Sequence, residues 1–237
     1  MESSYHQHIR VAGGFLVARA FEAEFSDDWF NPEFWGERAV PVTAGGRGAA
    51  WFLRRESGDL VLRHFCRGGI PGRFLRRGYL FAGSDNVRSF AEFRLLEALL
   101  DLGLPVPEPV AAGYQRSGLL FYRAAIIIRR IPGARPLSEF CSAEHLDLWA
   151  SAGACVRRFH DAGVFHADLN LMNILISDQV YLIDFERGRL MPASRPADWR
   201  DGNIQRLERS VNKCLGDLES GLRRQLWGAF LQGYRNP

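Results

Sequence analysis

The chain has 237 residues, of which 47% are hydrophobic and 12% aromatic, enough for one large domain or two small ones around a buried core. Acidic and basic residues nearly balance at a formal net charge of +3, so charge alone does not indicate a nucleic-acid partner. The stretch MESSYHQHIRVAGGF lacks a basic region followed by a long apolar one. We therefore expect no secretory signal, and no apolar run is long enough to predict a membrane-spanning helix.

The cysteines and lysines limit which residues of the chain could bind a metal or a phosphate. The four cysteines show neither a Cys-x-x-Cys motif nor a histidine at zinc spacing, so we expect reduced, mostly buried thiols, which suit a reducing cytosol. Lys213 is the only lysine among 30 basic residues. Any phosphate-binding cation earlier in the chain must therefore be an arginine. The cysteines are Cys66, Cys141, Cys155 and Cys214.

The first part of the chain, residues 1–130, is predicted to contain mainly strands and one helix. Residues 38–65 include the apolar runs AAWFL and LVLRHF, joined through RESGD, a pattern typical of a hairpin. SDNVRSFAEFRLLEALLDL, residues 84–102, repeats apolar residues at helical spacing and is followed by Gly and Pro, as helices often are. Two further strands are expected around residues 109–115 and 119–129.

The second part, residues 131–237, is predicted to be mainly helical. It opens with IPGARP, a linker candidate because Pro and Gly interrupt regular structure. A helix is expected near residues 142–161, since Trp149, Ala152, Val156 and Phe159 share one face. From about residue 197 onward the pattern is again helical.

Between these helices, HADLNLMNILI places polar residues directly before an apolar run. After Asn173 the sequence reads ILI, SDQ, VYLI and then Asp184, which predicts two strands joined by a polar turn. We expect the hairpin to bring Asn173 and Asp184 together at its open end. Their amide and carboxylate oxygens suit Mg²⁺, which keeps several waters and shares its remaining positions with phosphates.

Two further residues of this stretch are candidates for catalysis. Asp168 lies in the loop that enters the hairpin, five residues before Asn173, where we expect it to act near the same metal as the base for a substrate hydroxyl. His166 has two interpretations. It is either a packed, hydrogen-bonded support for the loop or a direct participant in catalysis.

HADLNLMN followed by LIDFE resembles the catalytic loop and metal-binding segment of the protein-kinase-like fold. The resemblance implies an α+β, bilobal architecture, with an antiparallel-sheet N-lobe over residues 1–130 that binds nucleotide and a mainly helical C-lobe over residues 131–237 that carries catalysis and binds the acceptor. It implies ATP as donor, Asp168 as base, and Asn173 and Asp184 as ligands of Mg²⁺. Glu186 replaces the glycine usual after the Asp-Phe pair.

The amino-terminal half matches the same fold less closely. TAGGRGAAWFL places Gly45, Gly46 and Gly48 before a strand, as in a degenerate phosphate-covering loop or in an ordinary hairpin turn. Arg63 stands where the fold uses a phosphate-binding lysine. Glu92 resembles the helix acid that pairs with this cation. Alternatively, Ser89 and Glu92 form a capping box at the start of a helix.

Over roughly residues 35–230 the chain resembles the kinases of 3-deoxy-D-manno-octulosonic acid (Kdo) in lipopolysaccharide assembly. This resemblance rests on LVLRHFCRGGIPGRFLRRGYLF, FAEFRLLEALLDLGLPVPEPVAAG, IIIRRIPGARPLSEF and FHADLNLMNILI. It implies phosphate transfer from ATP to a hydroxyl of Kdo on lipid A, the 4-position in the family, at the cytoplasmic face of the bacterial inner membrane. We expect no protein substrate, because the long activation segment of protein kinases is missing. We also expect no nucleic-acid partner, since the charge totals do not indicate one.

A basic segment fits peripheral attachment to an anionic membrane. Aromatic residues interleave its arginines, a combination suited to anionic headgroups, although a solvated basic loop has the same composition. The arginines are Arg63, Arg67, Arg73, Arg76 and Arg77.

Two other functions stay open at this point. One is a small-molecule kinase of this fold with a different acceptor. The other is a pseudokinase that binds nucleotide without catalysis, which the missing lysine favours and the trio of Asp168, Asn173 and Asp184 opposes.

Overall fold

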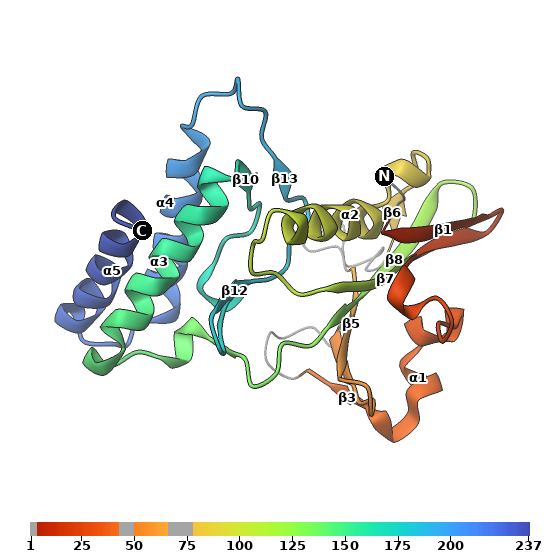
Figure 1. The fold of residues 1–237 in the computed structure, drawn as a ribbon, viewed down its shortest axis with the longest axis horizontal. Helices are drawn as coiled ribbons and strands as arrows, with labels where there is room; N and C mark the ends of the chain where they lie inside the picture. Colours follow the sequence, from red (N-terminus) through yellow and green to blue (C-terminus); the bar gives the residue numbers. More distant parts are fainter. Residues whose placement is uncertain (1–3, 43–49, 66–77) are drawn as a thin grey trace. The chain divides into compact units, whose positions relative to one another are not determined.

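The computed structural model describes residues 4–42, 50–65 and 78–237, which form two compact units (Figure 1). Unit 1 contains Met1–Glu97 and Glu108–Arg130, and unit 2 contains Ala98–Pro107 and Ile131–Pro237. The boundary after Arg130 is the one that we predicted, but Ala98–Pro107 joins unit 2. The reason is visible in its backbone, since the carbonyl of Pro105 accepts from the N–H of Leu182 at 3.1 Å.

Unit 1 is built on one antiparallel sheet in the order β1-β2-β7-β8-β5-β4-β3, with β6 pairing with β8. All of its strand pairs are antiparallel, as predicted for the N-lobe. The expected hairpin is β4 and β5, and the expected later strands are β7 and β8. The strands are β1 (Tyr5–Arg10), β2 (Gly13–Ala18), β3 (Ala39–Pro41), β4 (Ala50–Leu53), β5 (Leu60–His64), β6 (Tyr79–Leu80), β7 (Pro109–Ser117) and β8 (Phe121–Arg129).

Helix α2 (Arg88–Asp101) covers one face of this sheet. Phe90 and Phe93 on the helix are fully buried, and Phe90 meets the ring of Tyr114 on β7 with centroids 5.4 Å apart. Ser89 donates a hydrogen bond from Oγ to the carbonyl of Gly113 at 2.9 Å. These contacts bury the apolar stripe that the sequence places on this helix.

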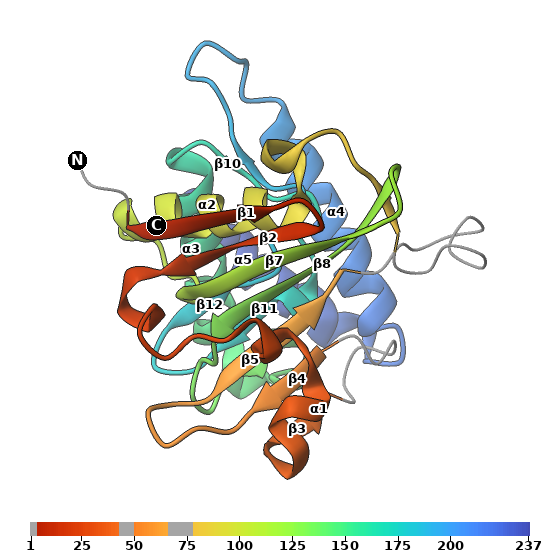
Figure 2. The same cartoon turned by 90° about the vertical axis from the view of Figure 1, so that its right-hand side faces the viewer.

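The segment between β2 and β3 packs on the other face of the sheet, so that Figure 2 shows α1 and α2 on opposite sides. Trp29 and Trp35 are buried there, and Trp35 donates from Nε1 to the carbonyl of Trp29 at 3.0 Å. A side chain at Gly113 would collide with the ring of Phe30 at 2.7 Å. The segment contains α1 (Pro32–Trp35) and 3-10 turns at Arg19–Phe21, Asp27–Phe30 and Gly36–Arg38.

Unit 2 is mainly helical, as predicted. Helices α3 (Leu146–Asp161) and α5 (Ser220–Arg235) pack closely against each other, and α4 is Trp199–Cys214. Glycine makes the crossing of α3 and α5 possible on both sides. A Cβ at Gly153 would lie 2.0 Å from the carbonyl oxygen of Phe230, and one at Gly233 would lie 1.9 Å from that of Ala150. No helix in the part of the chain that the structure describes is long and apolar enough to cross a bilayer.

Short strands complete unit 2. The predicted hairpin is present as β11 (Ile174–Ile176) and β12 (Val180–Leu182), and β11 also pairs with β9 (Arg135–Pro136). A second small sheet joins β10 (Val164–Phe165) to β13 (Arg189–Leu190). The loop between β10 and β11 therefore lies between two sheets, with both ends held by strand pairing.

Candidate active site

The loop from His166 to Asn173 in unit 2 is held by alternating apolar and polar contacts. Leu169 and Leu171 are fully buried. Between them, Asn170 accepts from the backbone N–H of Met172 at 2.9 Å and so caps the short 3-10 helix Leu171–Asn173. On α4, the hydroxyl of Ser210 accepts from the N–H of Leu171 at 3.1 Å. The loop backbone is thus fixed on both sides of its polar residues.

His166 is the buried support of this loop. Its side chain is 2% exposed. Nδ1 accepts from the N–H of Asp168 at 3.1 Å, and Nε2 lies 3.0 Å from the carbonyl oxygen of Ile183. Because Nδ1 accepts, Nε2 carries the hydrogen and donates to Ile183. Burial is the largest influence on the ring and lowers the pKa of His166, which favours this neutral form. Of the two roles predicted for His166, this geometry supports the packed, hydrogen-bonded support of the loop.

Asn203 on α4 adds two hydrogen bonds to the backbone of this loop. Its Oδ1 accepts from the backbone N–H of His166 at 3.2 Å, and its Nδ2 donates to the carbonyl of His166 at 3.1 Å. Asn203 is 3% exposed, so both bonds are shielded from water. An amide side chain is well suited to this position because it offers a donor and an acceptor side by side.

Asp168, the predicted base, is half exposed and paired with an arginine. Its side chain is 48% exposed. Nε of Arg206 on α4 donates to Oδ1 of Asp168 at 3.1 Å, and Nη2 of the same guanidinium contacts the same oxygen. Both contacts fall on Oδ1, which leaves Oδ2 as the oxygen that can accept a hydrogen bond from a hydroxyl. The arrangement fits a carboxylate that orients an acceptor.

Asn173 and Asp184 lie near the open end of the hairpin, but not directly opposite each other. Ile174 pairs with Leu182, and the N–H of Ile183 donates to the carbonyl of Asn173 at 3.0 Å. Asn173 therefore faces Ile183, and Asp184 follows one residue later. The φ of Asp184 is 63°, an uncommon left-handed value for a residue other than glycine. The strand β12 has ended at Leu182, so this left-handed residue lies in the segment that follows it.

The oxygens of these two residues fit the chemistry of Mg²⁺. Nδ2 of Asn173 donates to the carbonyl of Asp168 at 3.0 Å, so its Oδ1 is the atom that can bind a cation. The carboxylate of Asp184 is the other predicted ligand. Such hard oxygen ligands suit Mg²⁺, which takes its other ligands from water and phosphate. Within residues 4–42, 50–65 and 78–237, no group of three or more His, Cys, Asp or Glu side chains could hold a metal.

In unit 1, Arg63 on β5 forms the predicted ion pair with Glu92 on α2. Nη2 of Arg63 lies 2.6 Å from Oε1 and 2.5 Å from Oε2 of Glu92, whose side chain is 4% exposed. The capping-box alternative is wrong, because α2 begins at Arg88 and Ser89 is inside the helix, bonded to β7. A strand cation paired with a helix acid is the arrangement that the fold uses at its nucleotide phosphates.

Several predicted residues lie outside the described residues. Glycines of the predicted phosphate-covering loop and most arginines of the basic segment belong to this group, so their roles stay predictions. They are Gly45, Gly46, Gly48, Arg67, Arg73, Arg76 and Arg77.

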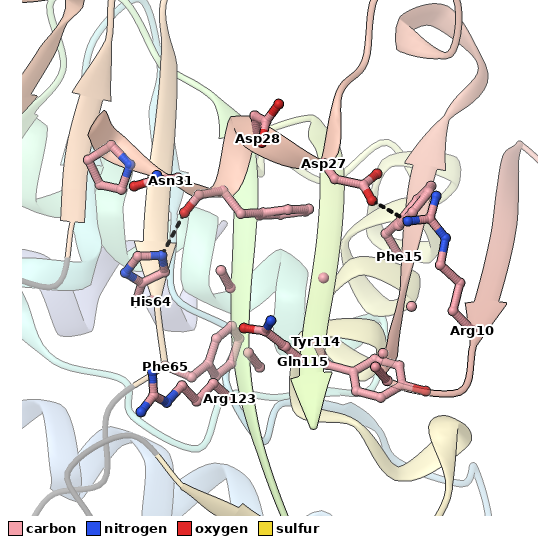
Figure 3. Close-up of a pocket in the computed structure, with 18 of the residues that line it drawn as sticks. Arg10, Phe15, Asp27, Asp28, Asn31, His64, Phe65, Tyr114, Gln115 and Arg123 are labelled. Atoms are coloured by element: carbon pink, nitrogen blue, oxygen red, sulfur yellow. Dashed lines mark hydrogen bonds and ion pairs between the residues drawn. The ribbon is translucent and has the colours of Figure 1, made fainter. Parts of the chain in front are cut away.

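A cavity of about 750 Å³ lies on the sheet of unit 1 (Figure 3). The floor of the cavity includes one residue from each of four neighbouring strands, and these residues pair with one another across the sheet. They are Phe15, Gly113, Ala125 and His64. Successive residues of a strand point to opposite faces, so Arg63, which precedes His64 and contacts α2, points away from this cavity. The cavity is therefore separate from the predicted phosphate-binding face, and an ion pair of Arg10 and Asp27 at 2.6 Å borders it.

Sequence reasoning missed the two residues of α4 that contact the predicted catalytic loop. Asn203 and Arg206 lie 37 and 38 residues beyond their partners His166 and Asp168. The signal available in the sequence was weak, since Asn203 is an amide on the apolar side of an otherwise amphipathic helix. Arg206 has no local feature that separates it from Arg209.

Together, the two units define a protein-kinase-like fold with the parts of a phosphotransferase. Unit 1 contributes an antiparallel sheet with a strand cation paired to a helix acid, and unit 2 a His-x-Asp loop that leads into the hairpin with the predicted metal ligands. The chain belongs to the lipopolysaccharide kinase (Kdo/WaaP) family, whose sequence profile matches residues 32–234. The predicted fold class and family are thus confirmed.

Individual relatives agree with this assignment. A 3-deoxy-D-manno-octulosonic acid kinase of Stenotrophomonas maltophilia (strain R551-3) is 44% identical over 212 residues, 88% of this chain and 84% of its own. A protein of the same name from Xanthomonas axonopodis pv. citri (strain 306) is 47% identical over the same shares. The solved structure of WaaP in complex with acyl carrier protein has the same fold, with a TM-score of 0.57, 15% identity, and coverage of 94% of this chain and 89% of that one.

Proposed function

We propose that the protein is a Kdo kinase. It transfers the γ-phosphate of ATP to a hydroxyl of Kdo on lipid A, at position 4, during assembly of the lipopolysaccharide core. The observation that carries the proposal is sequence identity of 44–47% to relatives with that name over 88% of this chain. The half-exposed carboxylate of Asp168 next to the predicted ligands of Mg²⁺ supports catalysis over nucleotide binding alone.

Each unit has its own part in the proposed reaction. In unit 2, Asp168 receives the acceptor hydroxyl at Oδ2 and orients it for in-line attack on the γ-phosphate. Asn173 and Asp184 would hold Mg²⁺, which when bound neutralises charge on the phosphates. In unit 1, Arg63 provides positive charge for the nucleotide phosphates, and Glu92 fixes the direction of its guanidinium.

With this acceptor, we propose that the enzyme works at the cytoplasmic face of the inner membrane, bound peripherally. The arginines between Arg63 and Arg77 support this location by their charge and their aromatic neighbours. Changing Arg73, Arg76 and Arg77 together to Ser should weaken sedimentation with vesicles that contain anionic lipid. Equal sedimentation of the two proteins would count against the membrane-binding segment.

The experiment that tests the proposed activity is a panel of acceptors with labelled ATP and Mg²⁺. The panel contains Kdo-bearing lipid A, lipid A without Kdo, an aminoglycoside and choline. We expect label only in the Kdo-bearing lipid, and magnetic resonance of the product should place the phosphate at position 4. Preferred transfer to the aminoglycoside or choline would instead show a small-molecule kinase with another acceptor.

A further inference from the structure

Arg206 occupies a place that catalysis by Asp168 does not explain. The guanidinium directs Nε and Nη2 at one oxygen of Asp168, and its side chain is 46% exposed. A cation fixed beside a carboxylate that must attract a proton opposes that transfer. An arginine at this position therefore calls for a further role.

Attachment of the loop to α4 does not supply this role. Asn203 and Ser210 already fix the loop to α4, through three hydrogen bonds to His166 and Leu171. The bonds from Asn203 are buried, whereas the pair of Arg206 and Asp168 is about half exposed on both sides. Exposed ion pairs contribute little to stability because water and salt screen them.

The guanidinium has capacity for a second anion. Asp168 uses Nε and one contact of Nη2, and an arginine has further N–H donors, including both on Nη1. Across the parts of the chain that the structure describes, no other hydrogen bond or ion pair from Arg206 is present. Solvent reaches both members of the pair, since each side chain is about half exposed. A planar guanidinium binds carboxylates with two parallel hydrogen bonds.

We propose that Arg206 binds the carboxylate of the acceptor sugar while it holds Asp168, and so makes the enzyme specific for acidic sugars. The inference rests on the proposed function, because Kdo is an octulosonic acid and carries a carboxylate at neutral pH. Without a cation between them, that carboxylate and Asp168 would repel each other. Arg206 compensates both charges and leaves Oδ2 of Asp168 to the hydroxyl.

The test compares two synthetic acceptors, Kdo–lipid A and the same lipid with the Kdo carboxylate converted to a carboxamide. We expect the wild-type enzyme to prefer the acid by roughly 10- to 100-fold in kcat/KM, the range for a charge-assisted hydrogen bond. Arg206→Gln should abolish this preference, largely through KM for the acid, and Arg206→Lys should restore part of it. ATP affinity, measured by calorimetry, should not change.

Arg209 provides the matched control, since it is an exposed arginine on the same helix. Arg209→Gln should keep the wild-type preference. A preference that survives in Arg206→Gln, or is absent from the wild type, would overturn the role of Arg206 alone. Transfer by the wild type to neither lipid would overturn the proposed function, and this inference with it.

Discussion

At the scale of single residues, two neighbours hold Asp168. The neutral ring of His166 binds its backbone N–H, and the guanidinium of Arg206 binds its carboxylate. His166 accepts from the N–H of Asp168 and stays neutral because it is buried. Arg206 contacts only Oδ1 of the side chain. The residue is therefore held in place, and its Oδ2 can accept a hydrogen bond from an acceptor hydroxyl.

Arg63 permits a direct test of the nucleotide site. Arg63→Met removes the cation of the ion pair with Glu92, whose side chain is 4% exposed. We expect a loss of stability of about 3 kcal/mol, because breaking a buried ion pair by removing one member is costly, and at least a tenfold loss of ATP affinity. Arg63→Lys keeps the charge and should recover most of both. Calorimetric titration with ATP and urea denaturation measure the two effects.

A matched control is Arg116→Met, a change of another sheet arginine that lies on β7. It should leave ATP affinity as in the wild type. Equal ATP affinity of Arg63→Met and the wild type would contradict the assignment of Arg63 to the phosphates.

His160 on α3 should make stability depend on pH. It is 1% exposed, and burial lowers its pKa to about 4. Between this value and the ordinary pKa near 6.5, the unfolded chain binds a proton that the folded protein does not. The stability that the neutral residue provides is complete above about pH 6.5 and is lost as the pH falls toward 4.

From pH 7 to pH 5, this single residue should lower the free energy of unfolding by about 2 kcal/mol. His160→Gln should make the pH dependence shallower by about that amount, and urea denaturation at both pH values measures it. The buried His166 shifts in the same direction, so some slope should remain. An unchanged slope in His160→Gln would be inconsistent with a neutral, buried His160.

At the scale of elements, the crossing of α3 and α5 depends on glycine. The Cβ of an alanine at position 153 would lie 2.0 Å from the carbonyl oxygen of Phe230, closer than any real contact. We expect Gly153→Ala to lower the stability of unit 2 by about 2 kcal/mol or more, since the helices must move apart.

Gly228 on α5 is the control, because a Cβ there meets nothing within 4 Å. Gly228→Ala should raise stability by up to about 1 kcal/mol through the better helix propensity of alanine. Thermal unfolding of the two variants separates the effects. A Gly153→Ala protein as stable as Gly228→Ala would show that the crossing is looser than the structure has it.

Elements with a strong local pattern could be predicted from the sequence. Apolar runs separated by polar turns predict strands without reference to distant residues. This pattern is present in the strands Ala50–Leu53 and Leu60–His64 and in the hairpin at Ile174–Leu182. The first strand, Tyr5–Arg10, was not predicted. It is an edge strand whose last four residues are exposed, so its sequence YHQHIR has no apolar alternation to detect.

Elements and contacts decided by tertiary structure could not be predicted in this way. The pair Ser89 and Glu92 fits a capping box as well as a catalytic pair, and only the contacts with Gly113 and Arg63 decide between the two. Asn203 and Arg206 reach the catalytic loop from a helix far along the chain. Only the fold brings these two residues to the loop, because no local spacing in the sequence indicates the contacts.

At the scale of the whole molecule, the family assignment and the chemistry of the two units agree. Family membership over residues 32–234 makes the chain a member of a group of kinases. The residues proposed for catalysis lie in unit 2 and those proposed for the nucleotide phosphates in unit 1. The departures from the common kinase pattern, Arg63 for lysine and Glu186 for glycine, keep a cation at position 63 and the carboxylate of Asp184, the charges that we propose for phosphate transfer.

The most direct measurement compares the wild type with Asp168→Asn in transfer of labelled γ-phosphate from ATP to Kdo-bearing lipid A in the presence of Mg²⁺. We expect transfer by the wild type, and a loss of at least a hundredfold in turnover with nearly unchanged ATP affinity in the variant, since the base acts on the acceptor hydroxyl. Absence of transfer by a wild-type enzyme that binds ATP, or equal turnover of the two proteins, would contradict the account.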